Sequence, residues 1–151
     1  MIILSFLLFV VGVVVWLVRS GCDPESLSAL VYEVPSGMQW VWVLWMEAVA
    51  FSMAPCLLDV LPEGCEVFGW LMVVCLMLCG GMPLVRNEEN RWHYLFAIMA
   101  GVLSQLCVVL LCPWWLLLWV LYLACLPFIG SRWCFWVEVA CAVGLYGCLW
   151  M

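Results

Sequence analysis

Four side chains have the chemistry to join a reaction or bind a polar ligand: Ser28, Glu47, His93 and Glu138. An imidazole beside a carboxyl group can exchange a proton, and an imidazole beside a serine hydroxyl can act as its general base. His93 is the only histidine in the chain. The first chemistry to consider is therefore hydrolysis or proton transfer with His93 as base and a carboxylate or Ser28 as its partner.

These groups stand in unusually apolar surroundings. The chain has 151 residues, of which 70% are hydrophobic and 9% charged. A soluble domain is nearer half apolar and a quarter charged, so this composition predicts an integral membrane protein. We expect one all-α transmembrane domain over residues 1–151, a bundle of six helices with short loops. The predicted spans are residues 2–18, 38–58, 67–82, 92–111, 114–129 and 133–151.

Proline and glycine mark the predicted span ends. Gly80-Gly81 and Pro83 are expected to end the third span, and Cys112-Pro113 to turn the chain between the fourth and fifth. Residues 24–34 are expected to form a short amphipathic helix with Leu27, Leu30 and Val31 on its buried face. Most tryptophans fall near predicted span ends, where indole prefers the membrane interface. Three fall inside spans and do not fit this belt: Trp45, Trp70 and Trp119.

The arginines predict the orientation. With six spans, Arg19, Arg86, Arg91 and Arg132 all fall on one side, and the chain has no lysine. The positive-inside rule makes that side cytoplasmic and places both termini outside. The expected location is a cell membrane, and the short loops favour a bacterial inner membrane.

Helical spacing predicts which residues face inward. An ionisable group costs roughly 2.5–3.5 kcal/mol in hydrocarbon, so Glu47 and Glu138 should face other helices or a polar recess. Their neighbours at helical spacing are small or polar, as helix-packing faces require. The predicted inward faces are His93, Ala97, Gly101 and Ser104; Gln39, Val43, Glu47, Ala50 and Ala54; and Cys134, Glu138 and Cys141.

Two interpretations of this recess compete. In the functional one, His93 and a carboxylate share a proton or bind a lipid head group at the cytoplasmic side. In the structural one, the polar groups only form hydrogen bonds between helices. A single histidine makes a metal centre improbable, no cofactor motif is present, and no basic run suggests nucleic-acid binding. We favour the structural interpretation.

Three motifs resemble a known family. Pro24-x-x-x-Ser28 follows the first span, Gly80-Gly81-x-Pro83 ends the third, and His93 opens the fourth. Together they resemble small, uncharacterised six-span membrane proteins that are distantly similar to the Frag1/DRAM-like family. The resemblance implies a six-helix bundle at the membrane and no defined reaction.

The functional expectation is a non-enzymatic, multi-pass membrane component that binds lipid or a membrane-protein partner. The sequence is also compatible with a homo-oligomer. One alternative is an intramembrane lipid hydrolase that uses the cytoplasm-facing recess. The other is a small transporter, which would need a water-accessible path through the bundle.

Overall fold

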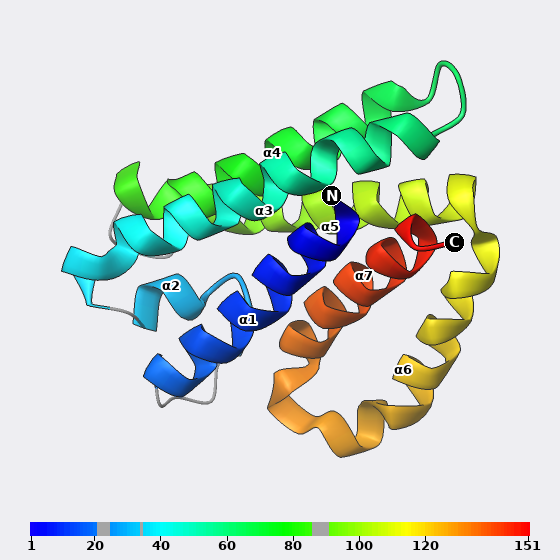
Figure 1. Cartoon of the computed structure of the whole chain (residues 1–151). Coiled ribbons are helices and arrows are strands. Elements are labelled where there is room, and N and C mark those ends of the chain that lie inside the picture. The colour runs from blue at the N-terminus through cyan, green and yellow to red at the C-terminus, as the bar shows by residue number, and fades with distance from the viewer. Residues whose placement is uncertain (21–24, 34, 86–90) are drawn as a thin grey trace.

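The computed structural model describes residues 1–20, 25–33, 35–85 and 91–151. The regular secondary structure of these residues consists of helices alone (Figure 1). The long helices are α1 (Ile2–Ser20), α3 (Gln39–Val60), α4 (Glu66–Val85), α5 (Arg91–Leu111), α6 (Leu117–Ile129) and α7 (Trp133–Leu149). Between them lie α2 (Leu30–Glu33) and the 3-10 helices η1 (Ser36–Met38), η2 (Pro113–Leu116) and η3 (Gly130–Arg132).

Glycine and proline make the sharp connections. Gly64 has a φ of +81°, which lets the chain turn between α3 and α4, and Gly130 has a φ of +61° at the end of α6. A side chain would be strained at such φ values. Pro113 is the first residue of η2, where its missing N–H costs no helical hydrogen bond. The predicted turn at Cys112-Pro113 is therefore present.

Each long helix packs on the next in the spatial order α1, α3, α4, α5, α7, α6. α3, α4 and α5 are sequential neighbours, α1 packs on α3, and α7 packs on α5 and touches α1 and α3 (Figure 1). α6 follows the outside of α7 and contains no buried residue. The outermost helices are thus also the most exposed to whatever surrounds the protein.

Contacts between distant segments define two ends. At one end, which we call the arginine end, Arg19 lies 3.2 Å from the Met38 sulfur. The Phe135 N–H at the same end donates to the Glu25 carbonyl at 3.0 Å. At the opposite end, the termini end, the rings of Phe6 and Trp150 lie 5.1 Å apart.

The apolar interior has two parts. The larger cluster joins α3, α4, α5 and α7 and fills the termini half with residues such as Leu57, Val108 and Leu145. The smaller cluster joins α1, α2 and α3 around Trp16 and Trp42, whose rings meet edge-on at 5.4 Å. The inward face predicted for residues 39–54 is confirmed at Gln39, Val43, Ala50 and Ala54, which are buried. Its fifth member, Glu47, is half-buried.

Four helices are long and apolar enough to cross a membrane, judged by length and composition among the described residues. They are Ile2–Arg19, Ser36–Val60, Glu66–Val85 and Arg91–Leu111. Pro113–Ile129 and Trp133–Leu149 are shorter apolar helices. The chain is therefore an all-α protein with the features of a multi-pass membrane protein.

The fifth expected span, residues 114–129, starts in the 3-10 helix Pro113–Leu116, and α6 itself begins at Leu117. Two other helices also differ in extent from the sequence-based expectation. The third expected span was to end at Met82, but α4 continues through Pro83, which is buried, to Val85. A proline in the last turn removes one hydrogen bond without requiring the helix to stop there. The amphipathic helix expected at 24–34 is only α2, Leu30–Glu33, although Leu27, Leu30 and Val31 are buried as expected.

Candidate functional site at the arginine end

Ser28 and Glu138 form a short polar contact at the arginine end. Ser28 precedes α2, and Glu138 lies in the second turn of α7. The Ser28 hydroxyl donates to Glu138 Oε1 at 2.6 Å, and the Ser28 backbone N–H donates to Oε2 at 3.0 Å. Both carboxyl oxygens are therefore held by one residue, which fixes the plane of the Glu138 side chain.

Two further hydrogen bonds hold this segment in place. The Ser26 hydroxyl accepts a hydrogen bond from the Ala29 backbone N–H at 3.0 Å, and its oxygen lies 3.5 Å from that of Ser28. The Phe135 N–H, near the start of α7, donates to the Glu25 carbonyl. Residues 25–29 are thus attached to α7 by backbone and side-chain bonds. We call Ser26, Ser28 and Glu138 the Ser28 cluster.

His93 lies in a second group of side chains. It opens α5 and is only 1% exposed. Its Nδ1 lies 3.7 Å from the Cys79 sulfur of α4, and its ring meets the Tyr32 ring of α2 edge-on at 5.2 Å. We call His93, Cys79 and Tyr32 the His93 cluster.

The segment 25–33 contributes to both clusters, through Ser28 and Tyr32. His93 contacts Cys79 and Tyr32, whereas Glu138 accepts its two short hydrogen bonds from Ser28. The structure brings Ser28 and Glu138 together and places His93 against other partners.

Glu47 belongs to neither cluster. It is half-buried in α3, and it makes no hydrogen bond to another described residue. The predicted inward face of α5 agrees with the structure. His93 and Ser104 are buried, and Ala97 and Gly101 are half-buried. The Ser104 hydroxyl donates to its own helix, at the Gly101 carbonyl, so it presents no proton to a ligand.

The chemistry open to the Ser28 cluster is limited. A hydrolase needs a nucleophile beside a base, and backbone N–H groups aimed at the developing oxyanion. Here the N–H of Ser28 is directed at Glu138 instead. Pro24 and residues 86–90, which include Arg86, lie outside the described residues. Within the described ranges no group of three histidine, cysteine or acidic side chains could hold a metal ion.

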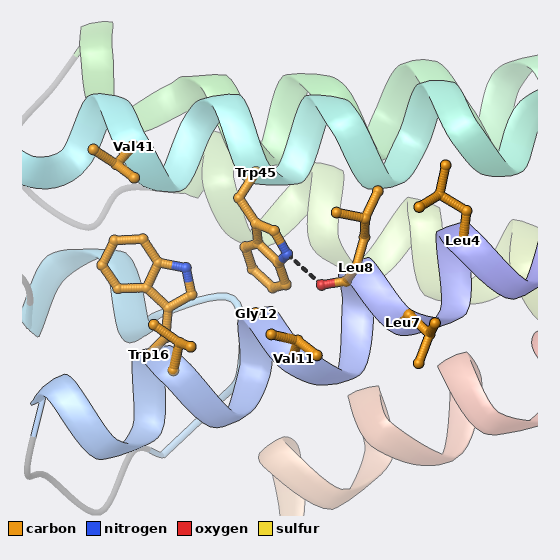
Figure 2. A pocket seen from close by; sticks show the side chains of 9 residues that line it. Leu4, Leu7, Leu8, Val11, Gly12, Trp16, Val41 and Trp45 are labelled. Atoms are coloured by element: carbon orange, nitrogen blue, oxygen red, sulfur yellow. Dashed lines mark hydrogen bonds between the residues drawn. The ribbon is translucent and has the colours of Figure 1, made fainter.

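Two tryptophans outside the interface belt have hydrogen-bonded roles that sequence reasoning missed. The Trp45 indole N–H donates to the Leu8 carbonyl of α1 at 2.8 Å (Figure 2). The Trp119 indole donates to Gln105 Oε1, also at 2.8 Å. Their positions inside apolar spans were the available signal, because a buried indole N–H usually finds an acceptor.

The Trp45 contact depends on Gly12. A Cβ on Gly12 would overlap the Trp45 indole nitrogen, so the ring lies directly on the backbone of α1. Beside this contact, a groove of about 370 Å³ runs between α1 and α3. We call it the α1–α3 groove, and its lining is Leu4, Leu7, Leu8, Val11, Gly12, Val15, Trp16, Val41 and Trp45.

Comparison with known proteins adds no relative to this picture. No family model, no curated protein and no solved structure matches the chain.

Proposed function

We propose that this protein is a six-crossing integral membrane protein that binds membrane lipid and catalyses no reaction. The observation that carries the proposal is the pairing of Ser28 with Glu138. A serine hydroxyl has one proton to donate, and here it goes to a carboxyl group that the same residue's N–H also holds. These polar groups bond to each other and join residues 25–29 to α7, which is the behaviour of a structural contact.

The six crossings are supported by length and by the order of the connections. Trp133–Leu149 has 17 residues, the lower limit for a transmembrane helix, and the 13 residues of α6 are extended at their start by the four-residue 3-10 helix Pro113–Leu116. Six crossings put Arg19, Arg91 and Arg132 on one side, which the positive-inside rule makes cytoplasmic. The family resemblance carried by Ser28, Gly80 and His93 also implies six membrane helices, and it stays a prediction.

The outer surface supports lipid contact. On α1 large apolar side chains such as Val14 and Val18 are 53% and 78% exposed. On α6 Phe128 is 89% exposed. Apolar surface of this extent on a soluble monomer would be an association site, whereas in a bilayer it is solvated by lipid chains.

The transporter alternative has less support. A water-accessible path would have to pass the termini half of the bundle. That half is filled by the larger apolar cluster, in which Leu57, Cys107 and Val108 are 0% exposed.

Reactivity at Ser28 is the feature that separates the proposal from a lipid hydrolase. The full chain is reconstituted in phospholipid vesicles and treated with a fluorophosphonate, which labels activated serines. Released fatty acids and head groups are measured by mass spectrometry in parallel. We expect no label on Ser28 and no lipid turnover.

The matched variants are Ser28→Ala and Glu138→Gln, with Ser52→Ala as the control serine. Turnover by the wild-type chain that Ser28→Ala abolishes, while Ser52→Ala and the amount of folded protein are unchanged, would overturn the proposal in favour of a hydrolase. Ser52 is a suitable control because its hydroxyl donates only to the Val49 carbonyl of its own helix.

A further inference from the structure

The α1–α3 groove is apolar along its length and open on one side. Its rim on α1 is formed by Leu4, Leu7, Val11 and Val15, which are 57%, 51%, 56% and 52% exposed. Figure 2 shows Trp16 and Leu8 extending from α1 toward α3, and Trp45 extending from α3 onto Gly12. The two indoles and Leu8 thus close the space between the helices.

The groove is about half as long as the hydrocarbon core is thick. From Leu4 to Val15 the helix rises roughly 16 Å at 1.5 Å per residue, against about 30 Å for the core. Because Leu4 is only the third residue of α1, a chain lying in the groove would start in the termini half, cross the bilayer midplane and end near the interface at the arginine end.

A cation lies where the groove meets that interface. Arg19 is four residues after Val15, so it occupies the same face of α1 one turn further on. Its guanidinium reaches the Met38 sulfur, which precedes α3, at 3.2 Å. Arg19 therefore bridges the two helices that form the groove. Within the described ranges no carboxylate forms an ion pair with it, and its guanidinium carries five N–H donors of the kind that bind phosphate oxygens.

We propose that the α1–α3 groove binds a phospholipid of the leaflet at the arginine end, with an acyl chain along Leu4–Val15 and the phosphate on Arg19. This inference rests on the proposed function and names the ligand and the site. Arginine presents paired N–H donors that match phosphate oxygens. A cation beside a groove between transmembrane helices is the arrangement by which such proteins hold lipid head groups.

A second protein helix fits the groove less well. Close packing of helices in a membrane needs small residues at the contact. The exposed rim consists of leucine and valine, and the one small residue, Gly12, is already covered by Trp45. A thin, flexible acyl chain needs no such approach of backbones.

Photo-crosslinking tests the site in the full chain. A phosphatidylcholine with a diazirine in its acyl chain is added to vesicles that contain the reconstituted protein. The matched probe is a diacylglycerol with the same acyl chains and no phosphate. We expect the phosphatidylcholine to label α1 and α3 in preference to α6, and the diacylglycerol to label them about fivefold more weakly, as loss of one arginine contact predicts.

The variants are Val15→Trp, Val14→Trp and Arg19→Gln. Val15 lines the groove and Val14 does not, yet the two side chains are 52% and 53% exposed. We expect Val15→Trp to reduce labelling of α1 and α3 to the level of α6, and Val14→Trp to leave it unchanged. Arg19→Gln should reduce phosphatidylcholine labelling to the level of the diacylglycerol.

Uniform labelling of α1, α3 and α6 in the wild-type chain would overturn the inference without the use of any variant. So would equal effects of Val14→Trp and Val15→Trp, or crosslinks between α1 helices of two copies in place of lipid adducts. None of these results would make Ser28 reactive, so failure of the lipid site and failure of the non-enzymatic proposal are distinguishable.

Discussion

The Ser28 hydroxyl donates a 2.6 Å hydrogen bond to Glu138, a residue 110 positions further along the chain. This contact joins the segment that follows α1 to α7. Together with the bond from the Phe135 N–H to the Glu25 carbonyl, it attaches residues 25–29 to α7. The same segment leads into α2, whose Tyr32 lies against His93. The polar residues of this protein therefore organise the arginine end of the bundle.

Gly12→Ala should destabilise the protein by about 1–3 kcal/mol, because the added methyl group overlaps the Trp45 indole. Reversible unfolding in mixed micelles measures the change. The control is Gly81→Ala, since a Cβ at Gly81 meets nothing within 4 Å and alanine is the better helix former. Equal stability of Gly12→Ala and wild type would contradict the close approach of Trp45 to α1.

Tyr146→Phe should lower the free energy of unfolding by about 0.5–1.5 kcal/mol. The Tyr146 hydroxyl lies 2.8 Å from that of Ser5, and both residues are buried at the termini end. Tyr122→Phe is the matched control, because the Tyr122 hydroxyl donates to the Trp133 carbonyl at an exposed position. A larger loss in Tyr122→Phe than in Tyr146→Phe would argue against the contact between α1 and α7.

Reporter fusions in a bacterial host test the orientation. Alkaline phosphatase is active only outside the cytoplasm, and green fluorescent protein exported in unfolded form does not fluoresce. We expect phosphatase activity from a fusion after Met151 and fluorescence from a fusion after Gly130, because the arginines predict a cytoplasmic loop at 130–132. Fluorescence from the Met151 fusion would place the C-terminus in the cytoplasm and would contradict the predicted topology of six crossings with both termini outside.

Most helix positions could be predicted from the sequence, because apolar length and turn residues act locally. The predicted span 92–111 corresponds to α5, Arg91–Leu111. One exception is the end of α4, where Gly80-Gly81 and Pro83 suggested a stop. A Cβ at Gly80 would lie 2.7 Å from Met46 Cβ, so this glycine serves packing against α3. The sequence pattern does not distinguish a glycine at a helix end from one at a helix contact.

The candidate site was less predictable. Helical spacing indicates which face of a helix points inward, but it does not say which helix lies opposite. Ser28, Glu138 and His93 were each candidates, and the expected pairing was with His93. The hydrogen bonds that the structure shows join Ser28 to Glu138, because residues 25–29 are attached to α7. Glu47 shares the inward stripe of α3 and still reaches neither cluster.

The sequence indicates that the Trp45 indole has a hydrogen-bond acceptor, but it does not identify that acceptor. Its indole lies too far inside a span for the interface, which indicated an acceptor within the bundle. The acceptor is the Leu8 carbonyl of α1. A backbone carbonyl leaves no mark in the side-chain pattern, and only the arrangement of α1 on α3 identifies it.

The structural role of the polar residues is tested most directly by a double-mutant cycle between Ser28→Ala and Glu138→Ala. Free energies of unfolding are measured in mixed micelles for wild type, both single variants and the double variant. We predict a coupling energy of about 0.5–2 kcal/mol, as expected for a hydrogen bond from a serine hydroxyl to a carboxyl group. The pair Ser52→Ala and Glu138→Ala should be additive. Additivity of the Ser28 and Glu138 variants within about 0.3 kcal/mol would contradict the account.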